Sequence, residues 1–279
     1  MSELEERRRA TVTLGDIGPS NMPPEKTPSA LRVAVRRIVT AAIVGAAIVI
    51  AWSLLARSTI PEVLPGPALV WSRFLTSISD GTYLPAFLTT LNEAALGWLL
   101  AAVIALPLGY ALGLFRTLED ALAPYLAGSQ AMPVVAIAPL LVIWLGVGLL
   151  PKVVVCALIA FFPMLATTAA GIRGVPRDLR DAARVFGASA LPLALHVDLP
   201  LAARTMFAGM KVAAALSVTG AVVGEFVSSD QGLGWMIQFG LQSLQTSLMF
   251  VALISLIVLG ALAYTAVSLV ERFVLRWDD

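Results

Sequence analysis

Cysteine, histidine and charged residues are all scarce in this sequence. It has one cysteine, Cys156, and one histidine, His196, which excludes a disulfide framework and leaves no Cys/His zinc site to expect. Charged residues make up 13% of the 279 residues, about half of the roughly 25% usual in soluble globular proteins. This scarcity excludes a soluble enzyme, a disordered chain and a nucleic-acid binder with a basic face. The formal net charge of +1 indicates no partner.

Apolar residues are abundant instead. Hydrophobic residues make up 58% of the chain, and the mean hydropathy is +0.87. A helix of roughly 20 apolar residues crosses a bilayer core about 30 Å thick. Six windows of this kind lie at 38–56, 94–115, 121–150, 153–172, 207–227 and 248–270. All are uncharged except the fifth, which contains Lys211 near one end and Glu225 near the other. We therefore predict an all-α integral membrane protein with six transmembrane helices.

The distribution of lysine and arginine predicts the orientation of these helices. If the N-terminus lies inside, 16 of the 19 basic residues fall on inner segments, and only Arg57, Arg73 and Lys152 lie outside. Cytoplasmic segments carry such an excess in membrane proteins. Both termini are therefore predicted to be cytoplasmic.

The predicted spans divide the chain into a tail and a membrane domain. Residues 1–37 are polar, mixed in charge and contain four prolines, which is typical of a cytoplasmic tail. Residues 38–279 form the transmembrane domain. Its outer segment, 61–85, contains Leu69, Phe74, Leu75 and Ile78, which predict a short helix lying on the membrane surface.

The long inner loop between the fourth and fifth spans covers residues 173–204. Pro176 suits the first position of a helix, and Gly187 suits the position just past its end. Apolar residues between them recur at steps of three and four on one face, at Leu179, Ala182, Ala183 and Phe186. A second short apolar helix is predicted over 190–197. On this pattern alone, the loop could also lie at the lipid headgroups with its arginines touching phosphates.

Two glycine pairs indicate close packing of helices. Gly109 and Gly113 are four residues apart, as are Gly220 and Gly224. In membrane helices this spacing lets two backbones approach closely. The contact could lie within one chain or between two copies.

A few polar or helix-breaking residues within the predicted spans are candidates for a solute pathway. Proline bends a helix and frees backbone carbonyls, and an intramembrane acid is a functional candidate by default. The candidates are Gln130, Pro133, Ser217, Thr219 and Glu225. The polar side chains could instead bond a neighbouring helix or their own backbone, and Glu225 could be solvated or brace an outer gate. No nucleophile, base and orienting group converge, so no active site is expected.

The inner loop resembles the EAA motif of ABC importer permeases. That motif is Glu-Ala-Ala, three residues, Gly, nine residues and Ile-x-Leu-Pro. The loop keeps this spacing in Asp181-Ala182-Ala183, Gly187 and Val197-Asp198-Leu199-Pro200, with Asp for Glu and Val for Ile. Three segments outside the loop resemble the nitrate/sulfonate/taurine branch of the family. They are Pro133, Pro139-Leu140, Trp144 and Gly146; Glu225 followed by Gly232-Leu233-Gly234; and Glu271-Arg272 with Leu275-Arg276-Trp277.

The resemblance, over roughly residues 60–279, implies a permease subunit with a type I importer core in a bacterial inner membrane. Two permease copies, expected as a homodimer, would form the pathway for a solute brought by an external binding protein. The solute would be nitrate-, sulfonate- or taurine-like, or a neutral organic such as a thiamine pyrimidine precursor, and no cofactor is implied. The loop would couple to cytoplasmic ATPase subunits through Arg177, Asp181, Ala182, Ala183, Gly187, Leu199 and Pro200.

The lysines of the chain agree with a separate ATPase. Lys26, Lys152 and Lys211 are its only lysines, and none follows a glycine as a phosphate-binding loop requires. The alternative is a self-sufficient secondary transporter or channel, which needs ionisable coupling sites within the membrane. Only Glu225 qualifies in the sequence. A membrane-embedded enzyme would need catalytic side chains that the sequence does not supply.

Overall fold

The computed structural model describes residues 30–131 and 133–275. All of the regular secondary structure in those ranges is helical. The chain divides into two compact units, residues 1–51 and 52–279. Helix α2 (Ala30–Arg57) begins in the first unit and ends in the second. It includes residues 30–37, the end of the predicted tail. The rest of that tail lies outside the described residues.

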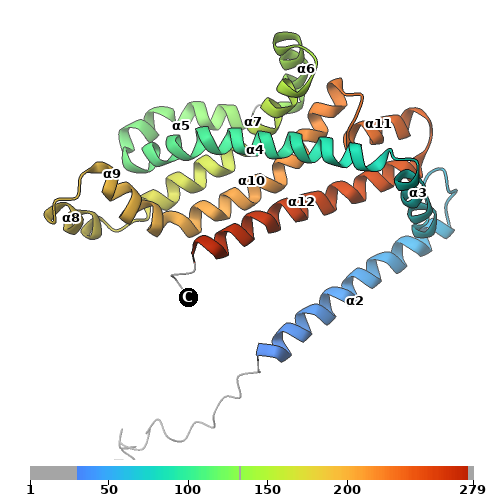
Figure 1. Cartoon of the computed structure of the whole chain (residues 1–279), viewed down its shortest axis with the longest axis horizontal. Coiled ribbons are helices and arrows are strands. Elements are labelled where there is room, and N and C mark those ends of the chain that lie inside the picture. The colour runs from blue at the N-terminus through green and yellow to red at the C-terminus, as the bar shows by residue number, and fades with distance from the viewer. Residues whose placement is uncertain (1–29, 132, 276–279) are drawn as a thin grey trace, which may run out of the picture. The chain divides into compact units, whose positions relative to one another are not determined.

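The second unit is built around four long helices. These are α4 (Tyr83–Leu114), α7 (Leu149–Arg173), α10 (Leu199–Ser228) and α12 (Thr246–Val274), and each is long and apolar enough to cross a membrane. Helix α7 packs along both α4 and α10, so it lies at the centre of the bundle. Figure 1 shows the shorter helices α8 (Arg177–Val185) and α9 (Ala190–Leu193) at one end of this bundle, and α3 (Pro67–Ser79) and α11 (Leu233–Gln242) at the other.

Four of the six predicted spans thus correspond to long apolar helices. The third predicted span, 121–150, is divided into α5 (Arg116–Ala131) and α6 (Val134–Leu145). Pro133 lies between the two helices, and Pro124 and Pro139 lie inside them. Each proline removes a backbone donor, which explains the interruption. The expected bend is thus a break between two helices, and α6 is too short to cross a bilayer alone.

Glycines allow the close packing around α7. A Cβ atom added at Gly109 or Gly113 of α4 would lie 2.7 Å from Thr168 Cβ or 2.6 Å from Ile172 Cβ. On the opposite side of α7, a Cβ at Gly220 would lie 2.6 Å from Cys156 Cα. Such separations are far below van der Waals contact. Both predicted glycine pairs therefore pack within the chain, against the same central helix.

The helix predicted in the outer segment is present as α3, and its position on the membrane surface stays a prediction. Its buried residues are Val70 and Ser77, and Phe74 stacks edge-on against Tyr83 with ring centroids 4.9 Å apart. Leu69, Leu75 and Ile78 are exposed. The helix thus packs on the bundle through the face that includes Phe74 and leaves the other three predicted apolar residues exposed.

Candidate coupling surface and buried polar network

The inner loop forms the helix that its terminal residues predict. Helix α8 covers Arg177–Val185, with Pro176 directly before it. Gly187 has a φ of +86°, a conformation that glycine adopts without strain. The amide of Gly187 donates to the carbonyl of Arg184, and the amide of Ala188 donates to that of Ala183, which together form a Schellman cap. Gly187 therefore fixes the end of α8.

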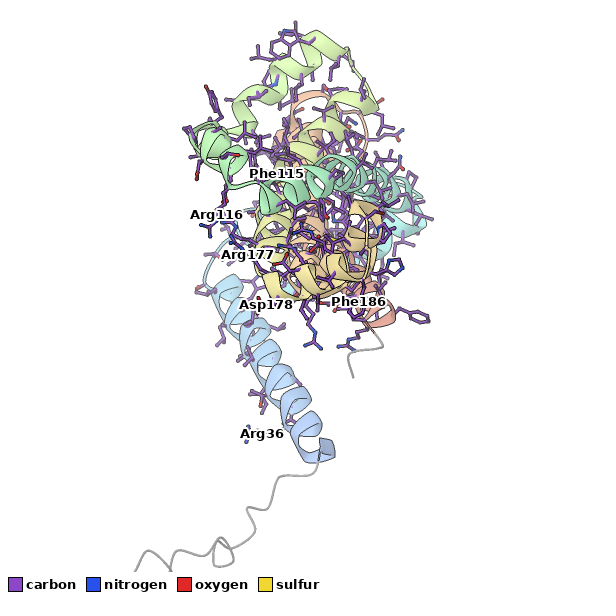
Figure 2. The ribbon with its side chains drawn as sticks, turned by 90° about the vertical axis from the view of Figure 1, so that its left-hand side faces the viewer. Arg36, Phe115, Arg116, Arg177, Asp178 and Phe186 are labelled. Carbon is purple, nitrogen blue, oxygen red and sulfur yellow. The ribbon has the colours of Figure 1, made fainter. Side chains whose placement is uncertain are left out.

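The apolar residues of α8 are exposed to solvent. Phe186 is 91% exposed and Val185 is 85% exposed, and no residue of the helix is buried. Figure 2 looks at this end of the bundle and shows Phe186, Arg177 and Asp178 there, together with the turn at Phe115 and Arg116. Of the apolar face predicted for this loop, Leu179, Ala182 and Phe186 are exposed, and Ala183 is partly buried.

The five charged residues of α8 alternate in sign along the chain, and all of them except Arg180 are exposed: Arg177, Asp178, Asp181 and Arg184. Arg184 pairs with Asp181 at 3.1 Å. Of the residues assigned to the loop motif, Ala182 is exposed and Ala183 is partly buried. Helix α8 thus presents an electrically balanced, partly apolar surface.

The second helix of the loop continues into the next span. Helix α9 is followed by a π-helical turn, Ala194–Asp198, and then directly by α10. Leu199 and Pro200 occupy the start of α10 and are partly buried. The predicted helix over 190–197 is therefore present, but it is joined to the fifth span without a break.

Glu225 lies in a buried polar network at the opposite end of the bundle. Its side chain accepts hydrogen bonds from the Thr90 hydroxyl at 2.6 Å and from the amides of Gly234 and Trp235. Those amides belong to the first turn of α11, where a helix has unpaired donors and a partial positive charge. Glu225 is fully buried, and its hydrogen bonds connect α10 to α11.

Two glycines make room for this carboxylate. A Cβ at Gly232 would overlap the Glu225 carboxyl group, and a Cβ at Gly234 would lie 2.7 Å from its Oε2 atom. Gly232 also has a φ of +118°. The spacing of Glu225 and the Gly-Leu-Gly segment thus has a steric reason.

The network includes an ion pair that the sequence analysis missed. Lys152 Nζ of α7 lies 2.8 Å from Glu93 Oε1 of α4 and donates to Ser229 Oγ at 2.9 Å. Both charged residues are buried. The sequence pattern that could have indicated a buried Glu93 is the stripe of small and polar residues on the same face of α4: Ala86, Thr90, Ala94, Gly97 and Ala101.

The remaining pathway candidates lie in different surroundings. Ser217 is buried and donates to the carbonyl of Ala214 in its own helix, at 2.8 Å. Thr219 and Pro133 are exposed. The side chain of Gln130 lies outside the described residues. A pathway role for these residues and for Glu225 stays a prediction.

Solved structures share this fold. A chain of the MetNI methionine ABC transporter, in an inward-facing conformation, matches with a TM-score of 0.60 and 21% sequence identity, over 68% of this chain and 94% of that one. A chain of an amino acid ABC transporter matches with a TM-score of 0.52 and 17% identity, over 71% and 97% of the two chains.

Sequence comparisons identify the family. The model of the family described as binding-protein-dependent transport system inner membrane component matches residues 105–276. The riboflavin transport system permease protein RibX of Chloroflexus aurantiacus is 46% identical, over 77% of this chain and 81% of that protein. The putative aliphatic sulfonates transport permease protein SsuC of Bacillus subtilis is 33% identical, over 78% and 79%.

The chain is therefore an ABC transporter permease, a multi-pass membrane protein. Within that class, the chain belongs to the binding-protein-dependent transport system inner membrane component family.

Proposed function

We propose that this chain is the permease subunit of an ATP-driven importer, coupled through α8 to a separate cytoplasmic ATPase. The observation that carries the proposal is the exposure of Val185 and Phe186 beside the Gly187 cap. Burying a side chain as large as Phe186 contributes about 1.5–3 kcal/mol. A groove on a partner protein would provide that burial and would hold the rigid end of α8.

The charge of α8 favours a protein partner over the lipid headgroups. Its four exposed charged residues are two arginines and two aspartates. Helices that lie on anionic membranes carry an excess of lysine and arginine on the polar face. An electrically balanced surface gives no such attraction, whereas alternating charges can pair with residues of a protein groove.

The proposed topology has six spans, with α2 as the first and α5–α6 as the third. The end of the bundle at α8 carries Arg116 and Arg177 (Figure 2), in agreement with the excess of basic residues on inner segments. This supports a cytoplasmic position for the loop and for both termini. The family description, an inner membrane component, supports the bacterial inner membrane.

A second copy of the chain is the proposed partner within the membrane. Helix α6 and the turn after it expose a series of large apolar residues: Val135, Ile143, Trp144 and Val147. Together the two copies would form the solute pathway, and an external binding protein would deliver the solute. The exposed apolar series supports a protein or lipid neighbour for α6.

The proposed solute is a small organic molecule, either a sulfonate or a neutral nitrogen heterocycle. The names of the relatives include riboflavin, aliphatic sulfonates and formylaminopyrimidine. The relative named for riboflavin is 46% identical, and the one named for aliphatic sulfonates is 33% identical. The larger identity supports the heterocycle.

Copurification tests the coupling role. The tagged full-length chain is extracted from its native membrane in mild detergent, and the proteins that accompany it are identified by mass spectrometry. We expect a P-loop ATPase in roughly equal amount, and its loss with Asp181→Arg or Gly187→Leu. Leucine at position 187 is strained at a φ of +86°, which would distort the end of α8.

The matched control is Gly128→Leu on α5. A Cβ at Gly128 would meet no atom within 4 Å, and its φ is not positive, so the ATPase should still copurify. If the unmodified chain purifies alone in detergent that preserves related transporter complexes, the secondary transporter or channel becomes the better interpretation.

A further inference from the structure

Arg180 is the residue of α8 that turns toward the bundle. Its side chain is 12% exposed, whereas most other residues of the helix are exposed. The guanidinium reaches Asp198 Oδ1 through Nε at 2.5 Å and the backbone carbonyl of Ile172 through Nη2 at 2.7 Å. Arg180 therefore joins α8 to the last turn of α7 and to the residue directly before α10.

Asp198 extends this connection to a third long helix. Its second carboxylate oxygen, Oδ2, accepts a hydrogen bond from the Tyr110 hydroxyl of α4 at 2.9 Å. Asp198 is fully buried. Hydrogen bonds to an ionised group are stronger than those between neutral groups. Removing the partner of a buried carboxylate strongly destabilises the folded protein. The three residues thus form a connection that resists separation.

The position of Arg180 within α8 determines what the connection does. The ends of α8 join the bundle through short turns containing Gly174 and Gly187. A helix held only by such turns could move without displacing the long helices. Because Arg180 lies in the middle of α8 and contacts both Asp198 and Ile172, a displaced α8 must carry the ends of α7 and α10 with it.

We infer that Arg180, Asp198 and Tyr110 form the joint that transmits movement of α8 to α4, α7 and α10. Arg180 and Asp198 are positioning residues, because they act through the helices and not on a solute. The inference rests on the proposed function, in which an ATPase moves α8. It goes beyond docking, since Arg180 faces the bundle and is not part of the exposed surface of α8.

The experiment uses the complex of the full-length chain with its copurified ATPase. An environment-sensitive maleimide dye is attached at Leu244→Cys, in the turn between α11 and α12, where Leu244 is 81% exposed. The native Cys156 is fully buried and should not react. Adding Mg²⁺ and a non-hydrolysable ATP analogue should change the dye signal in the complex that is otherwise unmodified.

Three variants then test the joint. Arg180→Gln should keep the ATPase but lose the nucleotide-dependent signal. The double variant Arg180→Gln/Asp198→Asn should regain it, because two neutral amides can bond each other without an unpaired buried charge. Tyr110→Phe should reduce the signal partially. Tyr125→Phe, on the exposed surface of α5, is the matched control and should change nothing.

The outcomes separate this inference from the proposed function. If no ATPase accompanies the unmodified chain, the proposed function fails. If the ATPase is present, the inference is overturned by a full signal in Arg180→Gln, by loss of the ATPase from that variant, or by a double variant as defective as the single one. If Arg180→Gln does not fold, an unchanged signal in Tyr110→Phe overturns it.

Discussion

Glu225 shows how a carboxylate is accommodated inside an apolar bundle. Its three donors come from α4 and from the first turn of α11. Replacing the acceptor would leave the amides of Gly234 and Trp235 buried without a partner. Each unpaired buried donor costs roughly 1–3 kcal/mol, so this single side chain stabilises the attachment of a whole helix.

We expect Glu225→Gln to destabilise the protein by roughly 1–3 kcal/mol, because the amide group of glutamine turns a donor toward donors. The thermal unfolding midpoint in detergent should fall, and the amides at the start of α11 should exchange hydrogen faster. Glu62→Gln is the matched control, since Glu62 is exposed. An unchanged midpoint in Glu225→Gln would show that the network does not hold α11.

The partners of Glu225 could not be predicted from the sequence. Glu225 itself was recognisable as an acid in an apolar helix, but Thr90 lies 135 residues away from it. Glu93 and Lys152 were interpreted as boundaries of spans, because a charge normally ends an apolar window. Their separation of 59 residues carries no local pattern. Pairing over such distances depends on the packing of α4, α7 and α10.

Features encoded within a few residues were predicted correctly at the scale of the helix. Pro176 and Gly187 delimit α8 because their backbone chemistry acts locally. The glycine pairs were also predicted to pack closely, and both lie against α7. The interruption between α5 and α6 was foreseen only as a bend at Pro133. Whether a proline bends or separates a helix depends on the neighbours that satisfy the freed backbone groups.

The packing of α10 on α7 leads to a prediction with an internal control. Gly220→Ala should destabilise the bundle by about 1–3 kcal/mol, since the new Cβ would lie 2.6 Å from the Cys156 backbone. Gly260→Ala makes the same change in α12, where a Cβ meets no atom within 4 Å. That variant should be neutral or slightly stabilising, because alanine favours a helix by about 1 kcal/mol over glycine.

The thermal unfolding midpoints of the two alanine variants, measured in the same detergent, show whether steric packing or the helix propensity of alanine determines the effect. A lower midpoint for Gly220→Ala only would establish the close approach of α10 and α7. Equal midpoints for the two variants would contradict it, because propensity acts on both helices alike.

At the scale of the whole molecule, the two ends of the bundle differ in chemistry. One end carries the exposed surface of α8 and the joint at Arg180. The other end carries α3 and α11 (Figure 1), and the first amides of α11 bind the Glu225 carboxylate. Helix α7 packs against α4 and α10 along its length, so a displacement near Ile172 can reach the neighbourhood of Lys152. This arrangement suits a protein in which an event on one side of a membrane changes the other.

That argument requires the two ends to lie on opposite sides of the membrane, which cysteine labelling can test. Phe186→Cys and Leu244→Cys are made one at a time, at residues that are both highly exposed. A membrane-impermeant maleimide should label Leu244→Cys in intact spheroplasts and Phe186→Cys only after the membrane is disrupted. The unmodified chain is the control, because Cys156 is buried.

Between residues 186 and 244 lies one helix long and apolar enough to span, α10 with its extension from Ala190. Labelling of both variants from outside would therefore mean that α10 does not cross the membrane. A reversed pattern would place α8 outside, where no cytoplasmic ATPase could reach it. The expected pattern, by contrast, places the capped loop on the side where ATP is available and the Glu225 network on the side from which a solute would enter.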